Sequence, residues 1–236
     1  MADKDALRRL HAGMILNFTS KKQEAAVAKA MEDVVIRIEK SFSIRLDHKR
    51  EWKLRDVVAR LEGEYPDVPF AEPFARSAMK PDGGVLSIVD THDVHHPILI
   101  AEVKNQGTNV KRVAEGKKRQ AKGNAIERLG KNVIGFRTAM LPEGIMPFVC
   151  FGYGCDFEDG SSILDRVVTI AMFGRLKEVN VVPLGESGQF GRGSYFFQED
   201  EWTVGEMADV MFEVASRAIH YYIAKYGAAA FPPPDR

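Results

Sequence analysis

The pattern of apolar positions predicts a long helix near the start of the chain and a second helix after it. Between residues 20 and 40, apolar side chains recur at the spacing of one helix face, and Ser20 is a suitable N-cap. These apolar positions are Val27, Met31, Val34 and Ile38. The second helix is predicted over Arg50–Glu62, with Trp52, Val57, Val58 and Leu61 facing inward. A proline-rich stretch over residues 66–73 then breaks the helical pattern.

The middle of the chain has the pattern of β-strands. Val85–Val89 and Pro97–Lys104 are apolar runs of strand length on either side of a polar connection, Asp90–His96. A third apolar run, Met146–Tyr153, is typical of a buried strand. The sequence therefore predicts a hairpin and a buried strand at the centre of the fold.

Helical patterns return in the second half of the chain. A loop and a helix are predicted around residues 119–140, and a long last helix over about Val204–Lys225. Ser161 or Ser162 could cap a further helix that runs through Leu164, Val167, Val168 and Met172. The glycines at 185, 188, 191 and 193 mark a mobile or turn-rich connection between weak strands. With no internal repeat and no obvious linker, we expect one mixed α/β domain.

Composition narrows the class of protein. The chain has 236 residues, of which 45% are hydrophobic and 28% charged, as in ordinary globular proteins. No apolar run approaches the roughly 20 residues needed to span a bilayer, and the N-terminus lacks the layout of a secretion signal. The two cysteines, Cys150 and Cys155, suggest a reducing compartment without a disulfide framework. We therefore expect a cytoplasmic protein that makes no use of a membrane.

Charge is distributed unevenly although the formal net charge is zero. Between Thr108 and Lys131 there are eight basic residues against two acidic ones, Glu115 and Glu127. The basic residues are Lys111, Arg112, Lys117, Lys118, Arg119, Lys122, Arg128 and Lys131. A solvated helix face is one interpretation of such a run. A phosphate-binding arm is favoured here, because the run directly follows a candidate metal site.

That candidate site comes from two short segments, Lys80-Pro81-Asp82-Gly83-Gly84 and Ala101-Glu102-Val103-Lys104. Successive side chains of a strand alternate between faces, so Glu102 and Lys104 project from the same side. A hairpin can return Asp82, in the turn before the first strand, to a place beside Glu102. Two carboxylates suit Mg²⁺, and a lysine beside them can hold a phosphate oxygen or help to orient a water. The pattern indicates metal-assisted hydrolysis of phosphodiesters.

Two other groups of residues invite alternative interpretations. His92, His95 and His96, with Asp90 and Asp93, could form a zinc site, but a hydrophilic hairpin tip is favoured. A stripe along the last predicted helix is expected to be core or dimer surface rather than a cofactor pocket. Its residues are Met207, Met211, Val214, Ala218 and Tyr222.

The segment Gly123-Asn124-Ala125-Ile126-Glu127-Arg128 has side chains that can read DNA bases. Asn can pair with the edge of adenine, and Arg can donate to guanine or to adenine N7. Glu127 can accept from exocyclic amines or hold the Arg128 guanidinium in place through paired hydrogen bonds. Gly123 permits a close approach of the backbone to a base.

With these motifs the chain resembles type II restriction endonucleases of the EcoRI/MunI family, within the PD-(D/E)xK nuclease superfamily. Three separated motifs occur in the family's order: Lys80–Gly84, Ala101–Lys104 with Gln106-Gly107, and Gly123–Arg128 with Lys131-Asn132. The similarity runs from about Lys80 to Phe157 and returns around Trp202–Tyr221, whereas the first 70 residues and residues 175–200 match poorly.

The resemblance implies an α/β, single-domain restriction-endonuclease-like fold over residues 1–236, with a central mixed β-sheet flanked by helices and a basic DNA-reading arm at about 105–131. Asp82 and Glu102 would bind Mg²⁺, and Lys104 would act near the scissile phosphate and the attacking water. Asn124, Ala125 and Arg128 would read the inner AATT bases, with Glu127 holding Arg128. The enzyme would be a homodimer that cuts double-stranded DNA at a palindrome and leaves four-base 5′ overhangs. The host would carry a methyltransferase for the same sequence.

Departures from the family pattern concern the outer base pairs. Lys122 stands where members of the family carry a small residue or an arginine, and a cation there could reach guanine. The family pattern has two arginines in the segment that matches Ile163–Arg166, and this chain has one of them, Arg166. These differences favour CAATTG over GAATTC. The residues predicted to grip phosphates are Lys111, Lys117, Lys118, Arg119 and Lys131.

The sequence therefore predicts a Mg²⁺-dependent type II restriction endonuclease. Two alternatives stay open at this point. One is a repair nuclease with the same metal-site fold that recognises a lesion or a branched structure. The other is a noncatalytic DNA-binding protein, which would have no need of converging carboxylates close to phosphates.

Overall fold

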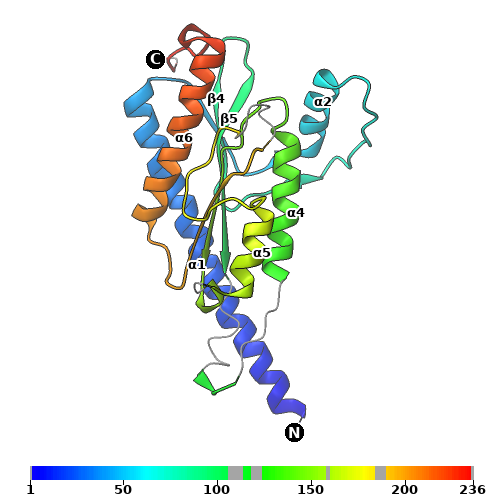
Figure 1. The fold of residues 1–236 in the computed structure, drawn as a ribbon, viewed down its shortest axis with the longest axis vertical. Coiled ribbons are helices and arrows are strands. Elements are labelled where there is room, and N and C mark those ends of the chain that lie inside the picture. Colours follow the sequence, from blue (N-terminus) through cyan, green and yellow to red (C-terminus); the bar gives the residue numbers. More distant parts are fainter. Residues whose placement is uncertain (1, 106–113, 118–123, 158–159, 184–189, 235–236) are drawn as a thin grey trace.

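A five-stranded mixed sheet forms the centre of the computed structural model, which describes residues 2–105, 114–117, 124–157, 160–183 and 190–234 (Figure 1). The strand order is β1-β4-β5-β6-β7. The bounds are Leu46–Lys49 for β1, Gly84–Val89 for β4, His95–Asn105 for β5, Phe148–Tyr153 for β6 and Ser194–Gln198 for β7. β1, β4 and β5 pair antiparallel, whereas β5, β6 and β7 pair parallel. The sheet thus changes its pairing mode at β5, the strand that carries Glu102.

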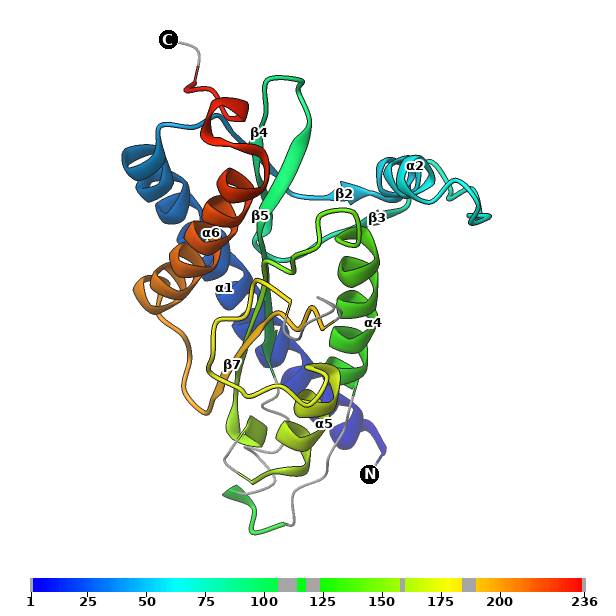
Figure 2. The ribbon, with the colours of Figure 1, turned by 45° about the horizontal axis from the view of Figure 1, so that its top comes forward.

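Helices cover both faces of this sheet (Figures 1 and 2). The long helices α1 (Ala2–Phe42) and α6 (Val204–Tyr226) pack together on one face, and α4 (Asn124–Ala139) and α5 (Ser162–Ile170) lie on the other. The helix α2 (Leu54–Glu64) projects to one side, next to the two-stranded sheet of β2 (Trp52–Lys53) and β3 (Ala78–Met79). Short 3₁₀ turns occupy Cys155–Phe157 and Ala228–Ala230. This α/β architecture confirms the predicted fold class.

Burial on both faces explains the composition of the central strands. All six residues of β4 and all six of β6 are buried, and eight consecutive residues of β5 are buried. Strands covered by helices on both sides read as continuous apolar runs, as these do. The stripe of Met207, Met211, Val214, Ala218 and Tyr222 is fully buried against α1 and the sheet. Of the two interpretations of that stripe, the structure supports core.

The N-terminal boundaries predicted from the sequence were wrong. Ser20 lies inside α1, which begins at Ala2, so Ser20 is not an N-cap. The second helix begins at Leu54 rather than Arg50, because Trp52 and Lys53 pair with Met79 and Ala78 to form a small sheet. Strand β1 was not predicted. Its pairing partner β4 lies far along the chain, and its residues alternate too weakly to indicate a strand.

The second half of the chain follows the prediction more closely. Of the two candidate caps, Ser161 accepts a hydrogen bond from Leu164 N and begins α5. That helix ends at Ile170 rather than Met172, because Met172 adopts a positive φ of 52°. The last helix begins at Val204, after a capping box formed by Thr203 and Glu206. It ends at Tyr226, one residue beyond the predicted Lys225. Among the helices of the described ranges, none has the length and apolar character needed to cross a bilayer.

Candidate active site

The turn before β4 places Asp82 next to strand β5. Gly84 N donates to Pro81 O at 2.9 Å and closes the turn, and Gly83 N donates to Ala101 O at 2.9 Å. Asp82 Oδ2 in turn accepts a hydrogen bond from Val103 N at 3.0 Å. The carboxylate is therefore anchored to the backbone of β5, with its remaining oxygen capacity available to other groups.

Strand β5 brings Glu102 and Lys104 to the same side of the sheet, as the alternation of strand side chains requires. Lys104 Nζ forms an ion pair with Glu102 Oε1 and lies 3.6 Å from Asp82 Oδ2. It also donates to Val103 O at 3.1 Å. The two carboxylates and the amine that the sequence singled out thus lie within one cluster.

Glu102 is the most deeply buried member of this cluster, with a side chain that is only 2% exposed. Burial raises the pKa of Glu102, opposed by the charge of Lys104 and assisted by the charge of Asp82. For Lys104, burial lowers the pKa, but the charges of Glu102 and Asp82 outweigh burial and raise it overall. Asn132 Nδ2 also donates to Glu102 Oε1, at 2.7 Å. Glu102 Oε2 is buried and has no hydrogen-bond partner within the described residues.

The donor set fits a hard divalent cation. Asp82 and Glu102 supply carboxylate oxygens, and the unpartnered Glu102 Oε2 has lone pairs free to bind an ion. Mg²⁺ commonly binds through one or two carboxylates and keeps several waters. In the described part of the chain no cluster of three or more His, Cys, Asp or Glu side chains is arranged to hold a metal. The protein could therefore supply part of a magnesium shell here, with water and substrate completing it.

A pocket of about 200 Å³ opens beside these residues. Its lining residues are Gln23, Glu24, Asp82, Val103, Lys104, Asn105, Arg128 and Tyr153. Gln23 and Glu24 come from α1 and Tyr153 from β6, and none of them was predicted to belong to the site. Their spacing along the chain gave no signal, because the packing of α1 across the end of β5 brings Gln23 and Glu24 here and the pairing of β6 with β5 brings Tyr153. Arg128, by contrast, was predicted to read bases and lies beside the catalytic candidates.

Four of the predicted base-reading residues lie on α4, and a fifth lies on α5. The helix begins at Asn124, so Asn124 and Ala125 form its first turn, and Glu127 and Arg128 are exposed. Arg166 is exposed on α5, which packs against α4. Lys122 and Gly123 lie outside the described residues.

The predicted phosphate contacts are described only in part. Lys131 is exposed on α4, and Lys117 is exposed and pairs with Glu115 at 2.7 Å. Such an exposed ion pair contributes little to stability, so Lys117 can exchange Glu115 for a phosphate at small cost. Lys111, Lys118 and Arg119 lie outside the described residues.

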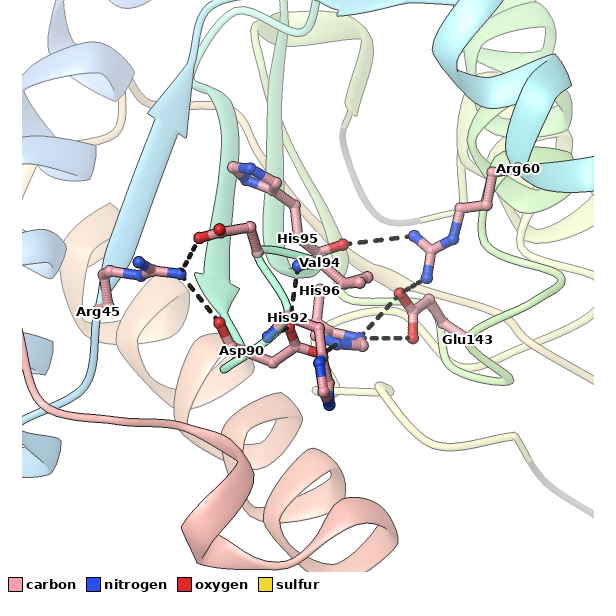
Figure 3. Close-up of polar contacts among 9 residues, drawn as sticks. Arg45, Arg60, Asp90, His92, Val94, His95, His96 and Glu143 are labelled. Carbon is pink, nitrogen blue, oxygen red and sulfur yellow. Dashed lines mark hydrogen bonds and ion pairs between the residues drawn. The ribbon is translucent and has the colours of Figure 1, made fainter.

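The histidine-rich connection forms the expected hydrophilic tip only in part (Figure 3). Asp90 Oδ1 accepts from His92 N at 2.8 Å and from Val94 N at 2.9 Å, so a tight turn over residues 90–94 is confirmed. His96, however, is buried on β5, with Nε2 3.2 Å from Asp90 Oδ2. The tip is therefore shorter than predicted, and strand β5 begins at His95 instead of Pro97.

A buried polar network extends from His96 to α2 (Figure 3). His96 Nδ1 lies 3.3 Å from a carboxylate oxygen of Glu143, whose side chain is fully buried, and Arg60 pairs with the same carboxylate. Burial alone would raise the pKa of Glu143, but the hydrogen bond from His96 and the charge of Arg60 lower it below its usual value. Arg60 and His96 both contact the carboxylate of Glu143, so this cluster ties α2 and β5 to the turn after α4.

Comparisons with known proteins agree with the geometry. The family described as restriction endonuclease EcoRI matches residues 11–171. The type II restriction enzyme RsrI of Cereibacter sphaeroides is 26% identical over 239 residues, which cover 87% of this chain and 86% of RsrI. The type II restriction enzyme EcoRI of Escherichia coli is 26% identical over 214 residues, 76% of either chain. The similarity thus extends into the first 70 residues, which the motifs alone had left out. Since the family match spans well over half of its length, the chain belongs to the EcoRI family of restriction endonucleases and is a site-specific deoxyribonuclease.

Proposed function

We propose that this protein is a Mg²⁺-dependent type II restriction endonuclease that cuts double-stranded DNA within a palindrome centred on AATT. The observation that carries the proposal is the convergence of Asp82, Glu102 and Lys104 beside a pocket that Arg128 also lines. Groups suited to hydrolysis and a group suited to reading bases thus meet at one place. CAATTG is the favoured target, GAATTC is the second choice, and the cut leaves four-base 5′ overhangs.

Each member of the cluster has a distinct role in this proposal. Asp82 and Glu102 hold the Mg²⁺, which when bound supplies positive charge to stabilise the charge that develops on the phosphate in the transition state. The ammonium group of Lys104 donates to a phosphate oxygen or orients the attacking water. Before a metal ion binds, the charges of Glu102 and Asp82 raise the pKa of Lys104 and so favour its ammonium form. Because Glu102 is buried, the electrostatic interactions at this position are stronger than they would be in bulk water.

Recognition is assigned to the start of α4. Asn124, Ala125 and Arg128 would read the inner bases, Glu127 would hold Arg128, and Gly123 would permit close approach. The outer pair would be read by Lys122 and Arg166. Phosphates would be gripped by Lys111, Lys117, Lys118, Arg119 and Lys131. In this proposal residues 1–236 act as one nuclease domain, with residues 105–131 as its DNA-reading arm.

A homodimer is proposed because a two-fold protein matches a two-fold DNA site. The interface is proposed to lie around two exposed apolar side chains. Ile134 on α4 is 67% exposed, and Phe173, just after α5, is 81% exposed. These helices pack against each other on the face of the sheet opposite α1 and α6 (Figure 2). A methyltransferase that protects the same sequence is expected in the host, and the enzyme is expected to work in the cytoplasm.

Replacement of the buried carboxylate tests the catalytic part of this proposal. Glu102→Ala should lower the rate of plasmid cleavage in Mg²⁺ by about a thousandfold or more, because a metal ligand is lost. Specific DNA binding should remain, since Glu102 contacts no base in this scheme. Glu213→Ala is the matched control, because Glu213 lies exposed on α6 and, among the residues that the structure describes, pairs with Arg217 alone. Cleavage by Glu102→Ala at the wild-type rate would refute the assignment.

A further inference from the structure

One hydrogen bond joins the proposed reading helix to the proposed metal ligand. Asn132 Nδ2, on α4, donates to Glu102 Oε1, on β5, at 2.7 Å. The side chain of Asn132 is partly buried. This contact therefore connects the element proposed to read bases with the strand proposed to hold the metal.

The bond makes the two oxygens of Glu102 unequal. Oε1 accepts from both Asn132 and Lys104, whereas Oε2 is buried and has no partner in the part of the chain described. A glutamate side chain has several rotatable bonds and loses considerable freedom when it is fixed. Two donors on one oxygen select an orientation in which the other oxygen stays available. That is the state a carboxylate needs in order to bind a cation without prior rearrangement.

Through this bond, the position of the Glu102 side chain depends on the position of helix α4. Arg128 and Asn132 are one helical turn apart and therefore lie on the same side of α4. Arg128 lines the pocket that Asp82 and Lys104 also line. On the adjoining side, four buried residues hold the helix against the core: Ile126, Leu129, Val133 and Phe136. A shift of α4 when it contacts DNA would therefore move Asn132 relative to Glu102.

We infer that Asn132 is a positioning residue, which holds Glu102 in its metal-binding orientation and makes that orientation depend on how α4 is seated on DNA. This inference rests on the proposed role of Glu102 as a metal ligand. Asn132 acts through Glu102, so its loss should change the response to Mg²⁺ more than it changes DNA affinity.

The main experiment measures single-turnover cleavage of a duplex that contains CAATTG or GAATTC over a series of Mg²⁺ concentrations. For Asn132→Ala we expect the Mg²⁺ concentration at half-maximal rate to rise by about tenfold or more, the usual scale for loss of an outer-shell partner. Excess Mg²⁺ should restore part of the rate. In EDTA, the affinity for the same duplex, measured by fluorescence anisotropy, should stay within about twofold of wild type.

Two further variants separate the hydrogen bond from packing. Asn132→Asp keeps the side-chain shape but replaces the donor with a carboxylate that repels Glu102, so its Mg²⁺ requirement should rise further than that of Asn132→Ala. It also serves if Asn132→Ala fails to fold, as thermal unfolding will show. Asn180→Ala is the control, because Asn180 is likewise partly buried and, within the described ranges, its side chain donates to the nearby Glu178 O alone.

The outcomes that oppose the inference are distinct. An unchanged Mg²⁺ dependence in Asn132→Ala would overturn it. A fall in metal-free DNA affinity that accounts for the whole loss of rate would also overturn it and would assign Asn132 to a DNA contact. Full activity of Glu102→Ala, or no cleavage by the wild type in Mg²⁺, would instead refute the proposed function on which the inference rests.

Discussion

At the scale of single residues, the turn that carries Asp82 depends on two glycines for different reasons. Gly83 packs against β5 so closely that a Cβ there would lie 2.8 Å from the Cβ of Ala101. Gly84 has a positive φ of 79°, and a Cβ there would lie 2.6 Å from Lys49 O. The first glycine permits close approach and the second permits the backbone conformation. Together they allow Asp82 to reach β5.

Replacement of Gly84 should therefore be costly. Gly84→Ala combines a left-handed conformation with a backbone clash, and we expect a loss of about 2–4 kcal/mol in the free energy of unfolding. Gly63→Ala is the control, since Gly63 lies in α2 and a Cβ there meets nothing within 4 Å. This control should be neutral or stabilising by up to about 1 kcal/mol. Urea unfolding measures both, and equal effects in the two variants would contradict the account.

The residues of the site differ in how far the sequence could reveal them. Asp82, Glu102 and Lys104 could be predicted because strand alternation and a Pro-Asp-Gly-Gly turn are local features. Asn132 and Gln23 could not be assigned a role, because their contacts arise from the packing of α4 and α1 against the sheet. A helix pattern shows which side of a helix is apolar, but not which neighbour each polar side chain meets.

At the scale of elements, the network around Glu143 joins parts of the chain that are far apart. Arg60 on α2 and His96 on β5 both contact the buried carboxylate of Glu143. Tyr221 and Lys225 on α6 donate to Glu143 O at 2.9 Å and 3.2 Å. The turn after α4 is thereby tied to three other elements. The periodicity of the sequence gave no sign of this network, since its members are single polar residues within apolar or mixed segments.

The network should contribute to the dependence of stability on pH. The pKa values of Glu143 and Asp90 are lowered in the folded state, against about 4.3 and 3.9 in an unfolded chain. The stabilisation from these two ionised carboxylates is therefore complete above their unfolded-state pKa values, and it is lost as pH falls through their lower folded-state pKa values. Glu143→Gln should reduce stability at pH 7 and flatten its decline below about pH 4.5. Chemical unfolding at a series of pH values measures this dependence. Glu213→Gln, at an exposed position, is the control and should leave the decline of stability in acid unchanged. An unchanged decline in Glu143→Gln would contradict the role of the network.

At the scale of the whole molecule, the proposed reading residues lie on one face of the sheet, and the pocket beside Asp82 and Lys104 also receives Gln23 and Glu24 from α1. α4 and α5 lie on one face, with the proposed reading residues and the exposed Ile134 and Phe173, while α1 and α6 form the other face. The mixed α/β class could be predicted from the run of helical and strand patterns. The family resemblance implied a mixed sheet, but the strand at which the pairing changes and the small sheet beside α2 could not be predicted, because both depend on pairing between distant segments.

The exposed apolar pair offers a test of the proposed dimer. Ile134→Asp and Phe173→Asp should each shift the protein from dimer to monomer, because a charge would be buried at the interface without a partner. Phe74→Asp is the control, since Phe74 is 87% exposed but lies in the connection between α2 and β3. Light scattering at several concentrations measures the mass. A dimer that persists in both variants would place the interface elsewhere.

The basic residues should make DNA binding depend on salt. Lys131→Ala should weaken binding about equally on all sequences and should lower the slope of log affinity against log salt concentration by about one. Arg128→Ala should instead reduce discrimination between sequences, at a cost of about 1–3 kcal/mol. Lys40→Ala, which removes an exposed lysine from the end of α1, should change neither. Equal loss of discrimination in Lys131→Ala and Arg128→Ala would contradict the division of roles.

The most direct test of the central claim is digestion of a sequenced phage DNA by the wild-type protein, with and without Mg²⁺, followed by mapping of every fragment end. The proposed function predicts cleavage only with the metal, at one palindrome centred on AATT, with four-base 5′ overhangs at each end. Absence of cleavage in Mg²⁺, or ends scattered without a common sequence, would contradict it.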